Sequence, residues 1–330
     1  MTAPLSASAT TAPAGAPAVP GSLPRTVPHV RVVVVTYSPG ECLPAFLHSL
    51  RQATRRAYEV VLADNGSTDG SVEAAARRPG VTLRPTGGNL GYAGGANAGA
   101  LGCAAEWLVV ANPDILWRPG SLDTLLDAAA RHPHAASLGP AIVTPDGRLY
   151  PSARALPSLG RGTGHALCGW WWPGNPWTAA YRNERGRPQE TAVGWLSGSC
   201  LLLRRSAFEQ IRGFEPAYFM YFEDVDLCDR LGRAGWRNIY VPAAVVEHAG
   251  GHATLRMPAE MLRAHHRSAY RYLAARHAGW RWLPLRLALA AGLALRYLLS
   301  VGLNRAAEGA QPTRSADVLG DPASGRSPAR

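Results

Sequence analysis

The 330-residue sequence contains no lysine: all 34 basic residues are arginine, against 23 aspartates and glutamates. The formal net charge of +11 implies attraction to polyanions, which include nucleic acid, an anionic membrane surface and phosphorylated substrates. The arginines accompany abundant alanine, which indicates a compositionally biased genome more than a phosphate-reading design. Charge alone therefore does not select a partner.

Cysteine is also scarce. The five cysteines are widely scattered and form no C-x-x-C pair, which excludes a zinc knuckle and a dithiol redox site. We expect them to be reduced thiols in a cytoplasmic protein. Residues 1–28 lack a basic start and an apolar run, so a disordered tail is expected there in place of a signal peptide, and a second one over 305–330.

Short β-branched runs alternate with helical stretches in the first third of the chain. Strands are expected over 30–37, 58–64, 81–85 and 106–112, and helices over 43–52, 69–77 and 93–105. This alternation predicts an α/β fold with a mostly parallel central sheet flanked by helices on both faces. A further strand and the start of a helix are expected within 193–208.

Polar, turn-forming residues follow the predicted strands, where open parallel sheets bind their ligands. The candidate contacts for a nucleotide at these strand ends are Thr36, Tyr37, Asp64, Asn65, Gly66 and Asn112. For the segment around Asp64, the alternative is an Asx-turn followed by a helix cap.

The glycine-rich stretch 87–100 leads into a predicted helix, whose first N–H groups can face an anion. It is neither a G-x-G-x-x-G fingerprint nor a P-loop, since G-K-[ST] is absent from the sequence. Asn89, Gly91 and Asn97 are its candidate ligand contacts. The alternative is a tightly packed loop without a ligand.

Residues 149–190 are rich in proline, glycine and tryptophan, and a long irregular insertion is expected there. Its aromatic residues and Arg154, Arg161, Arg182 and Arg185 predict an acceptor site for a sugar linked to a diphosphate. The alternative is a stiff cover packed on the domain.

Four acidic residues follow the aromatic run YFMYF, which begins at Tyr218. Apolar residues recur after it at helical spacing, so a helix is expected over about 224–234. Asp226 and Asp229 lie four residues before Arg230 and Arg233, a spacing typical of surface ion pairs.

Glu223 and Asp224 lie at the start of this helix, where capping of open N–H groups is one role for a carboxylate. The aromatic run can also wall a sugar site and partly desolvate Asp224. Desolvation raises the pKa of a carboxyl group and makes it a better general base. Asp224 is therefore the candidate base, and Glu223 is expected to support the site or to contact an acceptor sugar.

Seven segments occur in a fixed order along the chain: VVTYSPG, LADNGSTDGS, GGNLGYAGGAN, VANPD, GWLSGSCLLLRRSAFEQIRGF, YFMYFEDVDLCDRLGRAGW and VVEHAGG. With them, residues 30 to about 255 resemble the family 2 inverting glycosyltransferases. Two further segments, YPSARALPSL and NPWTAAYR, are similar to bacterial rhamnosyltransferases of this family that act on a polyprenyl-linked sugar.

The resemblance implies a GT-A-type nucleotide-sugar-binding domain over 29–255, with a nucleotide-binding half (29–115) and an acceptor-binding and catalytic half (116–255). A helical, membrane-associating segment is expected over 256–304. The implied reaction is inverting transfer of L-rhamnose from dTDP-β-L-rhamnose to a hydroxyl of GlcNAc-diphospho-polyprenol.

The resemblance also assigns roles to residues of this sequence. It places the nucleotide on Thr36, Tyr37, Asp64 and Asn89, and the catalytic base on Asp224 of the E-D motif. The candidate acceptor contacts are Arg154, Trp195, Ser197 and Gly198.

A divalent cation, Mg²⁺ or Mn²⁺, is implied after the fourth strand. Relatives with two acids there bind the metal directly, whereas Asn112 and Asp114 leave one carboxylate in this chain. One carboxylate suffices where diphosphate oxygens and waters complete the coordination. His248 matches a position where relatives add an imidazole ligand, which suits Mn²⁺, and its alternative role is structural.

Residues 283–303 have the length of a membrane span but include Arg286 and Arg296. With Arg281 they leave a broad apolar helix face, which predicts a helix lying in the interface of an anionic membrane. A spanning helix and a helix packed on the core are the alternatives. We therefore expect a peripheral protein on the cytoplasmic face of the cell membrane.

Other function classes fit less well. A sugar-phosphate nucleotidyltransferase usually has a basic, glycine-rich loop after its first strand, and TYSPGECLP contains no basic residue. Another family 2 transferase with a different donor or acceptor stays open. A non-catalytic basic protein would rest on charge alone, and without a recognition motif no nucleic acid is expected as a partner. The oligomeric state is open, a homo-oligomer included.

Overall fold

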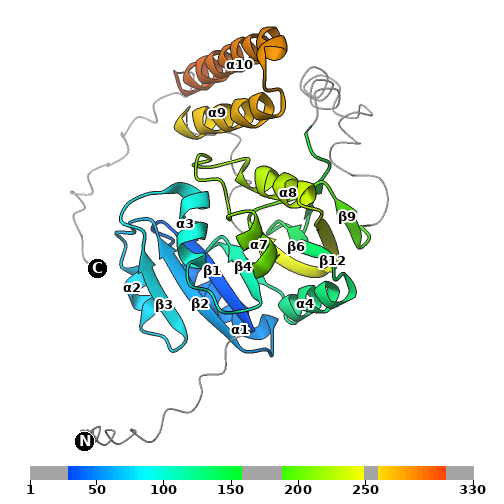
Figure 1. Ribbon diagram of the computed structural model, residues 1–330. Helices are drawn as coiled ribbons and strands as arrows, with labels where there is room; N and C mark the ends of the chain where they lie inside the picture. Colours follow the sequence, from blue (N-terminus) through cyan, green and yellow to red (C-terminus); the bar gives the residue numbers. More distant parts are fainter. Residues whose placement is uncertain (1–28, 158–187, 249–258, 310–330) are drawn as a thin grey trace, which may run out of the picture.

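The computed structural model describes residues 29–157, 188–248 and 259–309, which Figure 1 shows as a layered α/β unit with two helices above it. The first half contains β1 (Val30–Thr36), α1 (Cys42–Ala53), β2 (Tyr58–Asp64), α2 (Ser71–Ala76), β3 (Val81–Pro85), α3 (Gly91–Ala100), β4 (Trp107–Ala111), β5 (Ile115–Trp117), α4 (Ser121–Arg131) and β6 (Ala135–Val143). The predicted alternation of strands and helices is confirmed.

The second half is more irregular at its start. It contains β7 (Leu149–Tyr150), β8 (Ala153–Arg154), β9 (Thr191–Val193), β10 (Trp195–Leu196), β11 (Cys200–Arg204), α7 (Arg205–Gln210), α8 (Glu223–Arg233) and β12 (Arg237–His248). Most of the predicted insertion, with Arg161, Arg182 and Arg185, lies outside the described residues. The strand and helix start expected within 193–208 are present as β11 and α7.

The central sheet is mixed but mostly parallel. In the described residues its main path has the order β3-β2-β1-β4-β11-β6-β12-β5. β1 runs parallel to β2 and β4, and β12 runs parallel to β6, whereas β11 runs antiparallel to β4 and β6. The chain order reverses between β1 and β4, so the carboxyl ends of β1, β2 and β4 meet where open α/β sheets bind their ligands.

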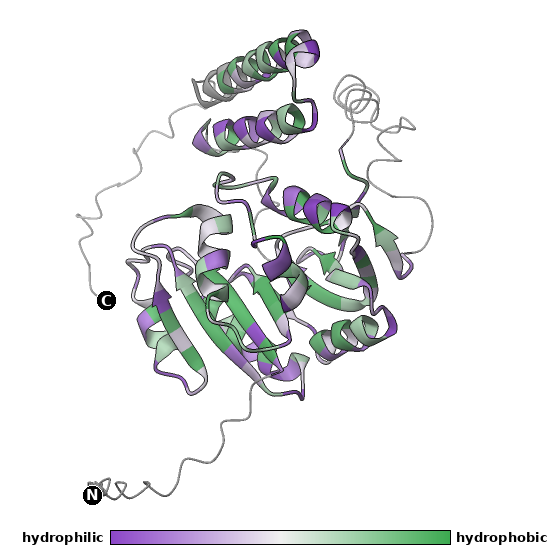
Figure 2. Cartoon of the chain, in the orientation of Figure 1, coloured by the Kyte–Doolittle hydropathy of each residue, from purple (hydrophilic) through white to green (hydrophobic). Residues whose placement is uncertain are grey.

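Both faces of this sheet are formed by hydrophobic residues. In Figure 2 the strands are accordingly mostly green, the colour of hydrophobic residues. Val32 and Val34 of β1 pack in a cluster with residues of α1, α2 and α4. Val33 and Val35 pack in a second cluster with residues of α3, α7 and α8. Successive side chains of a strand point to opposite faces, so burial on both sides explains the uninterrupted valine run of β1.

α3 differs from the helix expected over 93–105: it begins two residues earlier and ends five residues earlier. Extended backbone at Leu101 (ψ 133°) and a left-handed Gly102 (φ +65°) end it. A Cβ on Gly99 would lie 2.2 Å from Cγ1 of Val33, so a glycine at this position lets α3 approach β1 closely.

The C-terminal helical segment expected from the sequence is present as α9 (Ala259–Arg276), the 3₁₀ turn η1 (Trp280–Trp282) and α10 (Leu283–Gly309). α10 continues past the predicted start of the C-terminal tail at 305, and the rest of both predicted tails lies outside the described residues. Figure 1 shows α9 and α10 side by side at the top of the view, above α3 and α8. Among the described residues, 280–301 form the one helical stretch long and apolar enough to cross a membrane, and none of that stretch is buried.

Candidate active site

Asp64 ends β2 directly beside Thr36 of β1. Its carboxylate accepts hydrogen bonds from Thr36 Oγ1 (2.9 Å), from Ser67 Oγ (2.5 Å) and from the backbone N–H groups of Gly66 and Ser67. These bonds agree with the Asx-turn interpretation of this segment. Nucleotide contact by Asp64 stays a prediction. Tyr37, the predicted contact that follows Thr36, is 64% exposed to solvent.

Asn65 and Asn89 hold the glycine-rich loop through the backbone of Gly91. The buried Asn65 donates from Nδ2 to the Gly91 carbonyl oxygen at 3.0 Å and accepts from Thr86 Oγ1 at 3.0 Å. Asn89 Oδ1 accepts the Gly91 N–H at 3.0 Å. The structure therefore brings these three predicted nucleotide contacts together, with Asn65 acting as a tie between β2 and the loop.

The start of α3 is fastened to the aromatic run that precedes α8. The Tyr92 N–H donates to the Phe219 carbonyl oxygen at 2.9 Å. Gly91 has φ +71°, and a Cβ there would lie 2.1 Å from that same oxygen. The first two N–H groups of α3 therefore bond within the protein, to Asn89 and Phe219. An anion contact by the other N–H groups of this turn stays a prediction.

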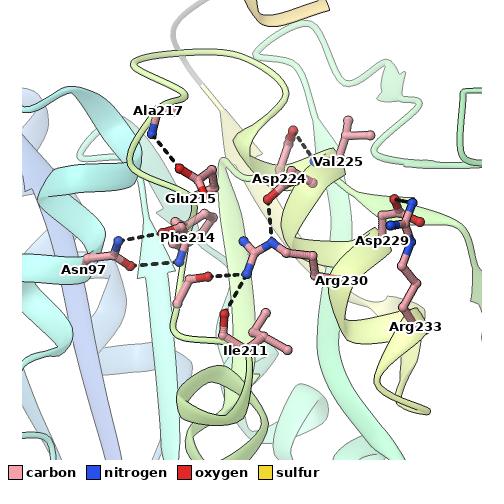
Figure 3. Close-up of polar contacts among 12 residues, drawn as sticks. Asn97, Ile211, Phe214, Glu215, Ala217, Asp224, Val225, Asp229, Arg230 and Arg233 are labelled. Atoms are coloured by element: carbon pink, nitrogen blue, oxygen red, sulfur yellow. Dashed lines mark hydrogen bonds and ion pairs between the residues drawn. The ribbon is translucent and has the colours of Figure 1, made fainter. Parts of the chain in front are cut away.

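Asn97, on α3, pairs with the main chain of the loop before α8. Its Nδ2 donates to the Phe214 carbonyl oxygen at 2.8 Å, and its Oδ1 accepts the Phe214 N–H at 2.9 Å, as Figure 3 shows. Both polar ends of the amide are engaged, so the geometry favours a structural role for Asn97. Its predicted contact with the nucleotide stays a prediction.

Asp114 and His248 come together at the carboxyl ends of β4 and β12. His248 Nε2 lies 3.1 Å from Asp114 Oδ1 and 3.5 Å from Asn112 Nδ2, and the imidazole is buried. In the part of the chain that the structure describes, no group of three or more histidines, cysteines or acids gathers as a metal site. A carboxylate and an imidazole fit a divalent cation whose other ligands come from a diphosphate and water.

Asp224 lies in the first turn of α8 and contacts Gly198 in the β10–β11 connection. Its Oδ2 accepts the Gly198 N–H and its Oδ1 accepts the Val225 N–H, both at 2.8 Å. Burial raises the pKa of the Asp224 carboxyl group, although these two N–H groups and the charge of Arg154 act in the opposite direction. The result is a fixed carboxylate with an increased affinity for a proton, as general-base chemistry requires.

Glu223, beside Asp224, is 7% exposed. Burial and the charge of Asp224 raise its pKa to about 8. Its Oε2 has no hydrogen-bond partner among the described residues. Phe222, the residue before α8, makes no side-chain cap bond. In the first turn it is Asp224 that accepts an open N–H group, that of Val225, and no such bond from Glu223 is present among the described residues.

The prediction that Asp226 and Asp229 form ordinary surface ion pairs is only half right. Each pairs with the arginine four residues on, at 2.6 Å for Arg230 and 2.9 Å for Arg233. However, Asp229 is buried and also accepts a hydrogen bond from Arg276 of α9 at 2.8 Å. Arg230 also donates to backbone carbonyls of the preceding loop, as Figure 3 shows, so both pairs join α8 to other elements.

Of the four predicted acceptor contacts, Gly198 bonds Asp224 and Arg154 lies close enough for its charge to act on Asp224. Arg154 pairs with Trp195 across the β8–β10 ladder, and its guanidinium carbon lies 5.3 Å from the centre of the indole ring. Gly198 follows on the same segment and holds Asp224 directly. Ser197 is buried, with its Oγ 3.2 Å from Ser199 Oγ.

Tyr92 is a site residue that the sequence interpretation missed. Its hydroxyl donates to the Gly198 carbonyl oxygen at 2.5 Å, while the N–H of the same glycine donates to Asp224. Burial, followed by the charge of Glu223, raises the pKa of Tyr92 well above its usual range, so the hydroxyl keeps its proton and donates. A single tyrosine inside a glycine-rich loop gives no sequence signal for this contact.

Comparison with known protein families shows which family has this sequence pattern. Glycosyl transferase family 2 matches residues 31–212, which include the ends of β1, β2 and β4 and the Gly198 segment. The chain belongs to glycosyl transferase family 2. This glycosyltransferase is 57% identical, over 282 residues, to N-acetylglucosaminyl-diphospho-decaprenol L-rhamnosyltransferase of Mycobacterium tuberculosis. The match covers 82% of the glycosyltransferase and 92% of the mycobacterial protein.

Solved structures agree on the fold of the glycosyltransferase. It is similar to the mannosyltransferase PcManGT from Pyrobaculum calidifontis in complex with GDP-Man and Mn²⁺ (TM-score 0.54, 19% identity, 88% of this chain and 77% of that one). It is also similar to GalNAc-T7 with UDP, GalNAc and Mn²⁺ (TM-score 0.54, 15% identity, 74% of this chain and 48% of that one). The predicted GT-A-type fold is thereby confirmed.

Glu223→Gln is expected to make the stability of the glycosyltransferase less dependent on pH. The folded protein keeps a proton on Glu223 up to about pH 8, whereas the unfolded chain releases it near the ordinary value of 4.5. The free energy of unfolding therefore falls as the pH rises through this interval. Glutamine carries no such proton. The difference between the Tm of the variant and the Tm of the wild type should therefore increase from pH 5 to pH 8. A Tm difference that is constant between these pH values would contradict the burial of an ionisable Glu223.

Proposed function

We propose that this glycosyltransferase transfers L-rhamnose from dTDP-β-L-rhamnose to a hydroxyl group of GlcNAc-diphospho-polyprenol, with inversion at the anomeric carbon. The mycobacterial relative supports the sugar and the acceptor, because its match extends over almost its whole length. The single observation that supports the mechanism is the Asp224 carboxylate, held by Gly198 and Val225 and within the electrostatic reach of Arg154.

Inversion requires one displacement at the anomeric carbon. The acceptor hydroxyl oxygen forms a bond to that carbon while the bond to the diphosphate oxygen breaks, and dTDP leaves with the electron pair. Asp224 takes the proton of the attacking hydroxyl. Its raised pKa increases the driving force for this transfer, and the two N–H groups keep its carboxylate oriented before the acceptor arrives.

A divalent cation is part of the proposal. Asp114 and His248 would hold it beside the ends of β4 and β12, where their side chains already lie 3.1 Å apart. Such an ion supplies positive charge to the leaving diphosphate. Since the two side chains offer one oxygen and one nitrogen, Mn²⁺ fits this pair at least as well as Mg²⁺.

The donor and the acceptor can be tested in one assay. The purified protein is incubated with dTDP-rhamnose, UDP-sugars or GDP-sugars, with and without Mn²⁺, on a GlcNAc-diphospho-lipid acceptor. Of the donors tested, we expect only dTDP-rhamnose to give product. NMR of the product should show the anomeric configuration opposite to that of the donor. Turnover of a UDP- or GDP-sugar in preference would favour the alternative, another family 2 transferase with a different donor.

We further propose that α10 places the enzyme on the cytoplasmic face of an anionic membrane, where a polyprenyl-linked acceptor resides. Its most exposed leucines are Leu287, Leu295, Leu298 and Leu299, each with 58–65% of its surface accessible. At about 100° per residue they fall on one side of the helix, opposite to Arg286 and Arg296, the two arginines within residues 283–303. An apolar face of this kind fits the acyl boundary of a lipid bilayer.

The double substitution Leu295→Gln and Leu298→Gln is expected to weaken binding to vesicles of phosphatidylglycerol and phosphatidylcholine by about tenfold or more, because two apolar side chains no longer enter the bilayer. Co-sedimentation with the vesicles measures the bound fraction. Leu101→Gln is the matched control, because Leu101 is 67% exposed but lies in the loop after α3. Equal binding of the double variant and the control would rule out α10 as the membrane contact.

A further inference from the structure

Two consecutive aromatic residues before the catalytic acids have unusual backbone conformations. Tyr221 has φ +66° and Phe222 has φ +67°, and Glu223 follows directly as the first residue of α8. Bulky side chains rarely adopt this left-handed region, and such strain persists only where surrounding contacts hold the backbone. The question is which part of the chain holds this turn, because the turn sets where α8 begins.

One face of α9 packs on the strained turn. Ser268 Oγ donates to the Met220 carbonyl oxygen at 3.0 Å. The ring centre of His265 lies 5.3 Å from that of Tyr221 and 5.6 Å from that of Phe222. Tyr272 continues the contact, with its ring centre 5.8 Å from that of Phe222.

The spacing of these α9 residues is regular. His265, Ser268 and Tyr272 follow one another at three and four residues, which places them on one side of a helix. Arg276, four residues further on, donates to Asp229 of α8 at 2.8 Å. The same helix face therefore holds both the turn and the helix that carries Asp224.

We propose that His265 and Ser268 are positioning residues for the transfer reaction: they hold the Tyr221–Phe222 turn so that α8 presents Asp224 in its reactive place. This inference rests on the proposed role of Asp224 as the base. His265 acts by packing, since burial, followed by the charges of His266 and Arg296, lowers its pKa to about 4 and leaves the ring neutral. α9 also carries α10, which meets it at the His266–Tyr297 ring contact, so the proposed membrane helix and the catalytic turn share one support.

His265→Ala is expected to lower kcat about 100-fold, because a misplacement of the order of 1 Å costs that much in an oriented reaction. The Kd for dTDP should stay that of the wild type, since no nucleotide candidate lies on α9. Hydrogen exchange, followed by mass spectrometry, should speed up in the peptide covering residues 219–224 and stay unchanged in β1 and β2. His265→Phe, which restores a neutral ring, should recover most of the lost kcat.

His266→Ala is the matched control. It also removes an imidazole with contacts in the helix pair. His266 bonds the Leu262 carbonyl oxygen, packs on Tyr297 and touches the His265 ring (5.8 Å between ring centres), but no described contact joins it to Tyr221 or Phe222. We expect a lower Tm with wild-type kcat and wild-type exchange in the 219–224 peptide. Equal losses of kcat in both variants would overturn the proposal, because the effect would then be one of general stability.

The exchange measurement separates this inference from the proposed function. If the protein turns over another nucleotide-sugar, the donor assignment fails, and the kcat comparison is repeated with that donor. If His265→Ala leaves exchange in the 219–224 peptide unchanged, or speeds it without lowering kcat, the positioning role is wrong whatever the donor. A His265→Phe variant as inactive as His265→Ala, with a normal Tm, would also overturn it, because His265 would then act through its ring nitrogens.

Discussion

Asp224→Asn is expected to lower kcat by about 10³-fold or more, because the acceptor hydroxyl loses the group that takes its proton. Asparagine has nearly the shape of aspartate, so α8 and the aromatic turn should stay in place. The Kd for dTDP should change by no more than a few-fold, since the nucleotide candidates lie at the ends of β1, β2 and β4 and in the glycine-rich segment with α3, not on α8. Single-turnover transfer from dTDP-rhamnose and calorimetric titration of dTDP measure the two quantities separately.

Asp226→Asn is the control for this substitution. Asp226 lies on the same helix two residues on, but its carboxylate pairs with Arg230 at 2.6 Å and does not contact Gly198. The control should lose some thermal stability and keep its kcat. Normal turnover by Asp224→Asn would sink the assignment of the base, and loss of turnover in Asp226→Asn alone would transfer the role to that residue.

Much of the sheet can be predicted from the sequence because its signals are local. The valine run of β1 indicates burial on both faces of the sheet. The polar residues after β1, β2 and β4 indicate that these strands end at the same edge of the sheet. Parallel pairing of neighbouring strands then places Thr36 beside Asp64 without further information. The position of Asp224 at a helix start also follows from periodicity, to within one residue of the observed start at Glu223.

Contacts between residues distant in sequence could not be predicted in this way. Asp229 has the spacing of a surface ion pair with Arg233, and only the docking of α9 shows that it is buried and bonded to Arg276. Asn97 lies in a glycine-rich segment typical of ligand loops, but its partner, Phe214, is 117 residues away. Local sequence patterns show which residues are polar or small. What those residues contact depends on the tertiary packing.

The same limit applies to the way the two halves of the site are joined. Tyr92 connects the glycine-rich loop to the catalytic half twice, through its N–H to Phe219 and through its hydroxyl to Gly198. Gly198 in turn orients Asp224. A displacement of the glycine-rich loop would therefore reach the base through two hydrogen bonds, which ties the predicted donor side of the site to the acceptor side.

Asp114→Asn is expected to reduce transfer by about 100-fold or more, because a metal clamp on the diphosphate is worth several kcal/mol and each 1.36 kcal/mol is a factor of ten in rate. Asparagine keeps a neutral oxygen near His248 but loses the negative charge that attracts a cation. Chelation by EDTA should stop the wild-type reaction, and Mn²⁺ should restore it at lower concentrations for the wild type than for the variant. Mn²⁺ binding in the presence of dTDP, followed by electron paramagnetic resonance, tests the site without turnover.

Glu247→Gln is the matched control for the metal pair, because this neighbouring acid pairs with Arg118 at 3.3 Å, away from Asp114. It should bind Mn²⁺ and turn over as the wild type does. Rates that are insensitive to EDTA, with Asp114→Asn still impaired, would show that Asp114 acts by holding the His248 ring and not by holding a cation. If His248→Asn weakened Mn²⁺ binding while Asp114→Asn did not, the imidazole would be the main ligand, which would reverse the order of importance inferred from charge.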